Sequence, residues 1–304
     1  MRQIAHIVNP FRPVGQPQFP FAQQVTLETM RAAQAFAAPE VDVRLFSAQY
    51  PEDASGLPAD FTPTPPLERS ILDLGAFAHP RKLPLLADIL ERLYTAAPHA
   101  ETLIYTNADI ALLPHFYRTV NRFIDKGLDA FVINRRTISD GYTSLAEIPV
   151  MYSETGQMHE GFDCFVFRRE ALPSYDLGDI AIGAPGVGRL LLWNMLLHAA
   201  NFHLFTTNHL TFHLGNDTEW AASASQEYAS YNWAIVRRFY DERIASAPAH
   251  SPVHAFIDDV RAELGLPISL QNKFRRTRSA LLGRLTHILG SSVRATPDKP
   301  DPGC

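Results

Sequence analysis

Apolar runs of strand length alternate with amphipathic stretches of helix length along the first half of the chain. Strands are expected over residues 2–8, 41–46, 70–74, 103–105 and 130–136, and helices over residues 19–38, 81–96 and 113–126. The run 103–105 is continuously apolar, as in a strand that is covered on both faces of a sheet. This alternation predicts an α/β fold with a doubly wound, mostly parallel sheet flanked by helices.

The second half of the chain is less regular. A strand is expected over 161–167, a glycine-rich loop over 178–188, a helix over 189–200, strands over 202–207 and 210–214, and helices over 219–243 and 253–264. Residues 51–66 are rich in Pro, Asp, Ser and Gly and predict a loop. The glycines of the 178–188 loop do not have the spacing of a dinucleotide fingerprint, and no apolar strand runs into them.

Polar residues follow the strand at 103–105 directly. Asn107 and Asp109 stand two residues apart, so they would face the same way in an extended chain. Ligands of open α/β sheets gather at the carboxyl ends of strands. The Asp109 carboxylate is a hard oxygen donor suited to Mg²⁺ or Mn²⁺, and such an ion would hold a diphosphate. An Asp near a strand end is also typical of a helix cap or a turn, so the motif alone leaves both interpretations open.

Composition narrows the class of protein. The chain has 304 residues, of which 46% are hydrophobic and 19% charged, which is an ordinary globular balance. The formal net charge of −5 gives no reason to expect nucleic acid as a partner. The most apolar long stretch, 190–205, is too short and too polar to span a bilayer, and the first residues do not have the form of a signal peptide. The two cysteines, Cys164 in an expected strand and Cys304 at the last position, do not have the pattern of a disulfide framework, so a cytoplasmic location is expected.

Several pieces of the chain form a recognisable series when they are taken in order. They are residues 81–90, 105–110, 161–168 and 182–186, then Trp193, and then His213 with Asn216 and Asp217. With these pieces the chain resembles glycosyltransferases of the GT-A fold, and in detail a bacterial group that has Asn-x-Asp in place of Asp-x-Asp. The resemblance covers about residues 1–220 and implies a GT-A-like catalytic domain that binds a nucleotide-sugar, followed by a C-terminal helical extension.

The resemblance also implies roles for individual residues. Asn9, Pro10 and Phe11 would lie beside the nucleoside, Asp73 would accept a hydrogen bond from the base or ribose, and Lys82 or Arg81 would face phosphate. Asn107 and Asp109 would meet the sugar diphosphate, with Asp109 and His213 as ligands of Mn²⁺ or Mg²⁺. Structural alternatives stay open for three of these residues. Asn9 can belong to a strand-ending turn, Asp73 can cap or pair with Arg69, and His213 can be a buried core residue.

One departure from the resemblance concerns the catalytic base. Relatives carry a Trp-Asp pair after the Gly-x-Pro-Gly turn, where this chain has Val187 and Gly188. An acidic residue there would take the proton from the acceptor hydroxyl in an inverting transfer. Three possibilities follow: the base comes from Glu160, Asp163 or Asp179, or the reaction retains configuration without such a base, or catalysis is lost.

The expected function is metal-assisted transfer of a sugar from a nucleotide-diphosphate donor to a hydroxyl of a glycan, a lipid-linked or another acceptor. The alternative is a non-catalytic GT-A-like binding module. Nucleotidyl transfer is disfavoured because the first strand is not followed by a glycine- and lysine/arginine-rich signature.

The C-terminal part, 221–294, is expected to be a helical extension. Its segment 271–294 carries Lys and Arg without acid, and apolar residues repeat in it at helical spacing. A basic amphipathic helix of this kind can lie on an anionic membrane surface, so peripheral contact with the inner face of the membrane is one of two expectations for it. A helix packed on the catalytic domain with a solvated basic face is the alternative. Residues 295–304 are expected to be a disordered tail.

Overall fold

The computed structural model describes residues 1–13, 18–159, 161–216, 226–248, 253–254 and 256. The chain divides into two compact units, Met1–Ser246 and Ala247–Cys304, and the account below concerns the first. The expectations for the basic segment 271–294 and for the tail 295–304 lie outside the described residues, as does most of the helix expected over 253–264. Within the described part, no helix has the length and apolar character needed to cross a membrane.

A seven-stranded sheet forms the centre of the first unit. In order across the sheet its strands are β10 (Phe202–Phe205), β6 (Ala130–Ile133), β9 (Cys164–Arg168), β4 (Thr102–Thr106), β1 (Arg2–Val8), β2 (Val41–Ser47) and β3 (Phe61–Pro63). β9 is antiparallel to both of its neighbours, β4 and β6, and the other pairs are parallel. The predicted α/β class with a mostly parallel, mixed sheet is therefore confirmed.

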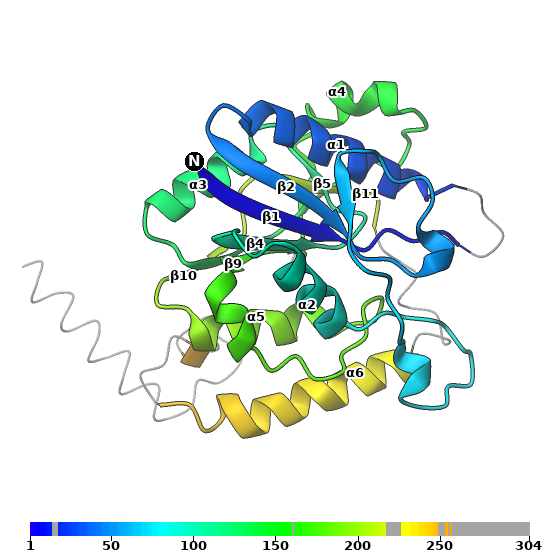
Figure 1. Cartoon of the computed structure of the whole chain (residues 1–304), viewed down its shortest axis with the longest axis vertical. Helices are drawn as coiled ribbons and strands as arrows, with labels where there is room; N and C mark the ends of the chain where they lie inside the picture. Colours follow the sequence, from blue (N-terminus) through cyan, green and yellow to red (C-terminus); the bar gives the residue numbers. More distant parts are fainter. Residues whose placement is uncertain (14–17, 160, 217–225, 249–252, 255, 257–304) are drawn as a thin grey trace, which may run out of the picture. The chain divides into compact units, whose positions relative to one another are not determined.

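Helices cover both faces of this sheet (Figure 1). The helices are α1 (Phe21–Ala37), α2 (Leu86–Ala96), α3 (Phe116–Asp125), α4 (Ile148–Met151), α5 (Val187–His198) and α6 (Gln226–Phe239). α1 and α3 pack together on one face, α2 and α5 lie on the other, and α6 packs against α5. Every residue of β4 and β6 is buried, as expected for strands that are covered on both sides.

A second, four-stranded sheet stands at the carboxyl end of β4. Its strands in order are β5 (Ala111–Leu112), β11 (Thr211–Leu214), β7 (Arg136–Ile138) and β8 (Gln157–Met158). β5 begins two residues after Asp109 and pairs antiparallel with β11, with Phe212 opposite Ala111. One further step along this register brings His213 towards Asp109. The second sheet thus joins two segments that lie about a hundred residues apart in the sequence.

Residues 70–74 were expected to be a strand, and this prediction is wrong. They contain a 3-10 helix, Ile71–Asp73, because Ser70 and Asp73 form a reciprocal capping box. The Asp73 Oδ2 atom accepts a hydrogen bond from the Ser70 backbone N–H at 2.6 Å, and the Ser70 Oγ atom accepts one from the Leu72 N–H at 3.2 Å. Two local hydrogen bonds outweigh the short apolar run.

Other boundaries also moved. The helix expected over 81–96 begins only at Leu86, because Pro84 disfavours helical backbone before it and Leu85 pairs with Ala181. The strand expected over 130–136 is divided between the two sheets, since β6 ends at Ile133 and β7 begins at Arg136. Residues 51–66 contain the short strand β3 within the expected loop. The helix expected over 219–243 is described from Gln226 as α6, and it continues as a π-helix, Tyr240–Ile244.

A buried histidine joins three elements beneath the carboxyl end of β4. The His6 ring lies 2.8 Å through Nδ1 from the Tyr117 hydroxyl of α3 and 2.9 Å through Nε2 from the Thr106 hydroxyl of β4. His6 is fully buried, and burial lowers its pKa from 6.5 to about 3. The ring is therefore neutral at pH 7, with one nitrogen donating and the other accepting.

This burial predicts a loss of stability in acid. Unfolded His6 binds a proton near pH 6.5, whereas the folded site stays neutral down to about pH 3. The free energy of unfolding should therefore fall as the pH drops from 6.5 towards 3, by up to about 1.4 kcal/mol per pH unit. Urea unfolding of the wild type and of His6→Gln between pH 7 and pH 4 checks this, because glutamine cannot titrate. Equal slopes for the two proteins would contradict the assignment.

Candidate functional site

The register of the central sheet brings several strand ends to one edge. Thr106 at the end of β4 and Ile133 at the end of β6 both stand opposite Cys164, the first residue of β9. The polar residues that come next in the chain, or just before β9, must therefore lie at this edge. They are Asn107 and Asp109 after β4, Asn134 and Arg135 after β6, and Asp163 before β9.

Asp109 and His213 face each other there. The Asp109 Oδ2 atom lies 3.3 Å from the His213 Nε2 atom. The His213 Nδ1–H donates to the Gly215 carbonyl oxygen at 2.9 Å, which orients the ring with Nε2 towards the carboxylate. The other carboxylate oxygen, Asp109 Oδ1, is buried and has no hydrogen-bond partner among the described residues. Asp109 thus has one oxygen that a ligand or ion can use.

The charges around Asp109 favour its ionised form. Desolvation by burial raises the pKa of the Asp109 carboxyl, but the hydrogen bond and charge of His213 and the charge of Arg135 oppose it. The net result is a pKa below the usual value for aspartate. Asp109 is therefore a carboxylate at neutral pH.

Asn107 and Tyr105 lie beside this pair. The Tyr105 hydroxyl donates to the Asn107 Oδ1 atom at 3.1 Å, and the Tyr105 ring stacks on Phe165 of β9. Desolvation, and then the negative charges of Asp109 and Asp163, raise the pKa of the Tyr105 hydroxyl far above its usual value. Asp109 and Asp163 thus both carry charge near the end of β4.

A buried ion pair completes the cluster. The Arg135 Nη1 atom lies 3.4 Å from the Asp163 Oδ1 atom, and their side chains are 3% and 9% exposed. Arg135 also acts on the pKa of Asp109, so its charge reaches both carboxylates. We use the name "edge cluster" below for Asp109, His213, Arg135 and Asp163.

The residues expected at the nucleoside also lie at this edge, after β1. The Asn9 Nδ2 atom donates to the Ala48 carbonyl oxygen at 2.5 Å, so the side chain holds the ends of β1 and β2 together. The Pro10 carbonyl oxygen accepts from Gln49 Nε2 at 3.1 Å. The side chain of Phe11, by contrast, is 49% exposed and presents an aromatic surface to solvent.

Asp73 and Lys82 have local partners. The Asp73 carboxylate is the acceptor of the capping box at Ser70, which matches the structural alternative for this residue. Arg69 instead pairs with Asp88 at 2.8 Å and with Asp179 at 3.2 Å. The Lys82 Nζ atom lies 2.5 Å from Glu52 Oε1 and 3.9 Å from the centre of the Tyr50 ring.

The three candidate bases have different surroundings. Asp163 belongs to the edge cluster, whereas Asp179 is in a half-exposed ion pair with Arg69, outside the contacts of that cluster. Glu160 lies outside the described residues. Of the two candidate bases within the described residues, Asp163 is therefore the one that lies in the same cluster as Asp109.

Arg135 was missed in the sequence, although a signal for it was present. The polar pair Asn134 and Arg135 follows an apolar strand in the same way as Asn107 and Asp109 do. Because the strand was extended to residue 136, these side chains were assigned to the sheet and not to its edge. Ending the strand at the last apolar residue, Ile133, would have placed them correctly.

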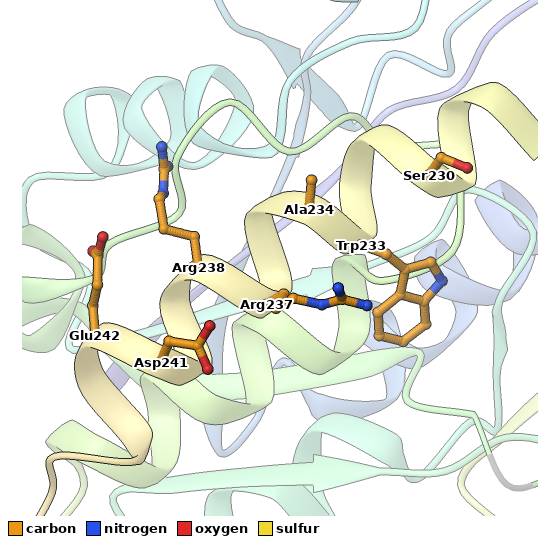
Figure 2. A pocket seen from close by; sticks show the side chains of 7 residues that line it. All are labelled: Ser230, Trp233, Ala234, Arg237, Arg238, Asp241 and Glu242. Carbon is orange, nitrogen blue, oxygen red and sulfur yellow. The ribbon is translucent and has the colours of Figure 1, made fainter.

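A cavity of about 740 Å³ lies elsewhere, along α6 and its continuation. It is lined by Ser230, Trp233, Ala234, Arg237, Arg238, Asp241 and Glu242 (Figure 2). None of the residues proposed from the sequence lines it. Its size alone does not assign it a function, and the chemistry of the edge cluster makes that edge the stronger candidate site.

Comparisons with known proteins were made for the whole chain. No protein-family model matches it, and no curated protein matches it. Among solved structures, S. aureus TarS 1–349 in complex with UDP-GlcNAc has a TM-score of 0.47 and 13% identity, covering 86% of this chain and 73% of that chain. The catalytic domain of Drosophila β1,4-galactosyltransferase 7 in complex with xylobiose has a TM-score of 0.42 and 12% identity, covering 78% of this chain and 80% of that chain.

A mutant of the Drosophila enzyme in complex with manganese, UDP-Gal and xylobiose has a TM-score of 0.40 and 11% identity, covering 72% of this chain and 73% of that chain. These matches include the class of protein that the sequence resembles. Because the scores and identities are low, the function is argued below from the side chains of this chain.

The two ion pairs predict different costs for two similar substitutions. Asp163→Ala removes a carboxylate from the buried Arg135 guanidinium and should lower the free energy of unfolding by about 3–5 kcal/mol. Asp179→Ala removes a half-exposed partner of Arg69 and should cost less than about 1 kcal/mol. Urea unfolding at pH 7 measures both. Similar costs would show that Asp163 is not held in a buried pair.

Proposed function

We propose that this protein is a glycosyltransferase that moves a sugar from a nucleotide-diphosphate donor to an acceptor hydroxyl, with a divalent metal ion at Asp109 and His213. One observation carries the proposal. At the carboxyl edge of the central sheet, the Asp109 carboxylate faces the His213 Nε2 atom at 3.3 Å, while its second oxygen is buried and unpartnered among the described residues. Ligand sites of open α/β sheets lie at this edge.

The donor set of Asp109 and His213 fits a divalent ion such as Mn²⁺ or Mg²⁺. Carboxylate and imidazole are acceptable ligands of Mn²⁺, and a metal-binding histidine usually donates its other N–H to a carbonyl, as His213 does to Gly215. The described residues contain no group of three or more His, Cys, Asp or Glu that could hold an ion. Diphosphate oxygens and water would therefore have to complete the coordination of an ion that Asp109 and His213 hold. A bound ion would neutralise the diphosphate leaving group as the glycosidic bond breaks.

The other residues of the edge supply binding and orientation. Asn107 is held by the Tyr105 hydroxyl next to Asp109, where it can hydrogen-bond the sugar diphosphate. Phe11 presents its exposed ring at the end of β1, where a nucleoside base can stack on it. Lys82 stands over Tyr50 at the end of β2 and can turn from Glu52 to a phosphate. Asp73 is engaged in its capping box, so the base or ribose is assigned to Asn9, Pro10 and Phe11.

For an inverting transfer we assign the role of general base to Asp163, which would take the proton from the acceptor hydroxyl. Asp163 is the described candidate in the edge cluster, and Glu160 and Asp179 are the alternatives. The ion pairs of Asp163 and Asp179 favour a second candidate function. Because Asp163 is engaged with Arg135 and Asp179 with Arg69, a binding module that keeps the donor site without turnover is the competing proposal.

The proposed transfer requires that the acceptor carry a hydroxyl group. A glycan or lipid-linked acceptor, and contact with a membrane through 271–294, stay predictions from the sequence.

Calorimetric titration with UDP, GDP, ADP and CDP tests the donor site. In Mn²⁺ the wild type should bind one of these nucleotides, and a chelator should remove the binding. Asp109→Ala and His213→Gln should each weaken it by about 100-fold or more, since removal of even an outer-shell partner of a metal costs 10–100-fold. Glu170→Ala, which removes an exposed carboxylate that pairs with Arg168, serves as the matched control and should bind as the wild type does.

The outcomes separate the two proposals. Metal-dependent binding, together with release of the nucleoside diphosphate from the corresponding sugar donor, supports the enzyme. Metal-dependent binding without release from any donor favours the binding module. If no nucleotide binds at millimolar concentration, the metal-dependent donor site is wrong.

A further inference from the structure

Arg189 is a cation without an acidic partner in the described part of the chain. It stands in the first turn of α5, and its guanidinium lies 5.8 Å from the centre of the Phe162 ring and 5.9 Å from that of Trp193. Its Nε atom is buried and has no hydrogen-bond partner among the described residues. The rest of the residue is partly exposed, and an arginine whose Nε–H is taken out of water is usually paired with a carboxylate.

This placement destabilises the charged guanidinium in three ways, which the contacts among the described residues offset only in part. Desolvation lowers the pKa of Arg189, which means that burial disfavours its charged form. A positive charge in the first turn of a helix opposes the helix dipole. A buried N–H group without an acceptor loses the hydrogen bond that it would make with water. Cation–π attraction to the Phe162 and Trp193 rings offsets part of this destabilisation. These rings do not accept hydrogen bonds in the plane of the guanidinium.

The first turn of α5 lies against Phe162, the residue before Asp163 of the edge cluster. A Cβ atom added to Gly188 would stand 2.7 Å from the Phe162 carbonyl oxygen, so the helix backbone touches the segment that runs into Asp163. α5 also packs on β6 and β9, the two strands whose ends carry Arg135 and Asp163. Arg189 is therefore fixed by its own helix next to the residues that precede β9 at the edge of the sheet.

We propose that Arg189 is a substrate-binding residue that holds an oxyanion, a phosphate or carboxylate group, beside the edge cluster. The flat guanidinium, kept in place by Phe162 and Trp193, suits two parallel hydrogen bonds to such a group. In the framework of the proposed function, on which this assignment rests, the group belongs either to the diphosphate of the donor or to an acidic acceptor. Both sources offer the same chemistry to the guanidinium.

Calorimetric titration of wild type, Arg189→Gln and Arg189→Lys distinguishes the sources. The probes are the nucleoside diphosphates, inorganic pyrophosphate and glycerol phosphate, the last with and without saturating nucleotide. Arg189→Gln should weaken binding of the oxyanion by about 10-fold or more, because a hydrogen bond to a charged group is lost. Arg189→Lys should restore part of the affinity, since it keeps the charge but not the fork. Arg168→Gln is the matched control, because Arg168 ends β9 at the opposite edge and pairs with Glu170.

Weaker binding of both nucleoside diphosphate and pyrophosphate assigns Arg189 to the donor diphosphate. Unchanged nucleotide binding with weaker binding of glycerol phosphate assigns it to an acidic acceptor. If the wild type binds no nucleotide but binds pyrophosphate or glycerol phosphate through Arg189, the proposed function fails while the oxyanion site stands. Equal binding of all probes by wild type and a folded Arg189→Gln, or no oxyanion binding by the wild type, overturns the proposal. Thermal melting verifies that each variant is folded.

Discussion

The antiparallel position of β9 between β4 and β6 is the constraint on which the candidate site depends. In a fully parallel sheet only the residues after strands would meet at the ligand-binding edge. Because β9 runs the other way, the residues before it, Phe162 and Asp163, arrive at the same edge as Asn107 and Arg135. The first turn of α5 is thereby packed against this edge, since a Cβ atom at Gly188 would stand 2.7 Å from the Phe162 carbonyl oxygen. The reversed direction of β9 thus places the Asp163 carboxylate at this edge and gives α5 a segment to pack against.

The second sheet provides the histidine by an equally short route. β5 follows Asp109 after one intervening residue, and the pairing of β5 with β11 leaves little freedom for where His213 can go. The Gly215 carbonyl then selects the orientation of the ring. The Asp109–His213 contact is thus determined by backbone pairing more than by attraction between the two side chains, which are long-range partners in sequence. A contact held by the backbone keeps its geometry when a ligand or ion takes over one of the interactions.

The parts of the fold that the sequence predicted share a physical character. Strands such as β4 and β6 are covered on both faces, so all of their residues must be apolar or buried. A continuous apolar run in the sequence is enough to predict such a strand. The strand predicted over residues 70–74 was wrong because the two side-chain hydrogen bonds of the Ser70 capping box stabilise a 3-10 helix there. The pattern of apolar residues contains no information about these hydrogen bonds. The two-residue strands β5 and β8 could not be anticipated, since their existence depends on partners elsewhere in the chain.

The residues of the candidate site also differ in this respect: a local sequence pattern predicts some of them, and long-range strand pairing determines the others. Asn107 and Asp109 were visible as polar residues at a strand end, and Arg135 carried the same signal one strand further on. The partner of Asp109 was visible only through a resemblance, because no spacing rule relates residue 109 to residue 213. Arg189 gave no signal at all in the sequence, where a basic residue at a helix start reads as a surface charge.

The structure adds a kind of information that periodicity does not contain, namely which buried polar atoms lack partners. Among the described residues, the buried side-chain atoms without a hydrogen-bond partner include Asp109 Oδ1, Asn134 Oδ1 and Arg189 Nε, at or against the carboxyl edge of the central sheet, and others elsewhere, such as Arg118 Nε. A folded chain usually satisfies its buried polar groups, because each unsatisfied group costs about 1–3 kcal/mol. Two of these atoms have opposite requirements, since Asp109 Oδ1 needs a cation or a donor and Arg189 Nε needs an acceptor. A metal-bound phosphate ester has this combination of charges, so it would link the donor site proposed at Asp109 with the oxyanion site proposed at Arg189.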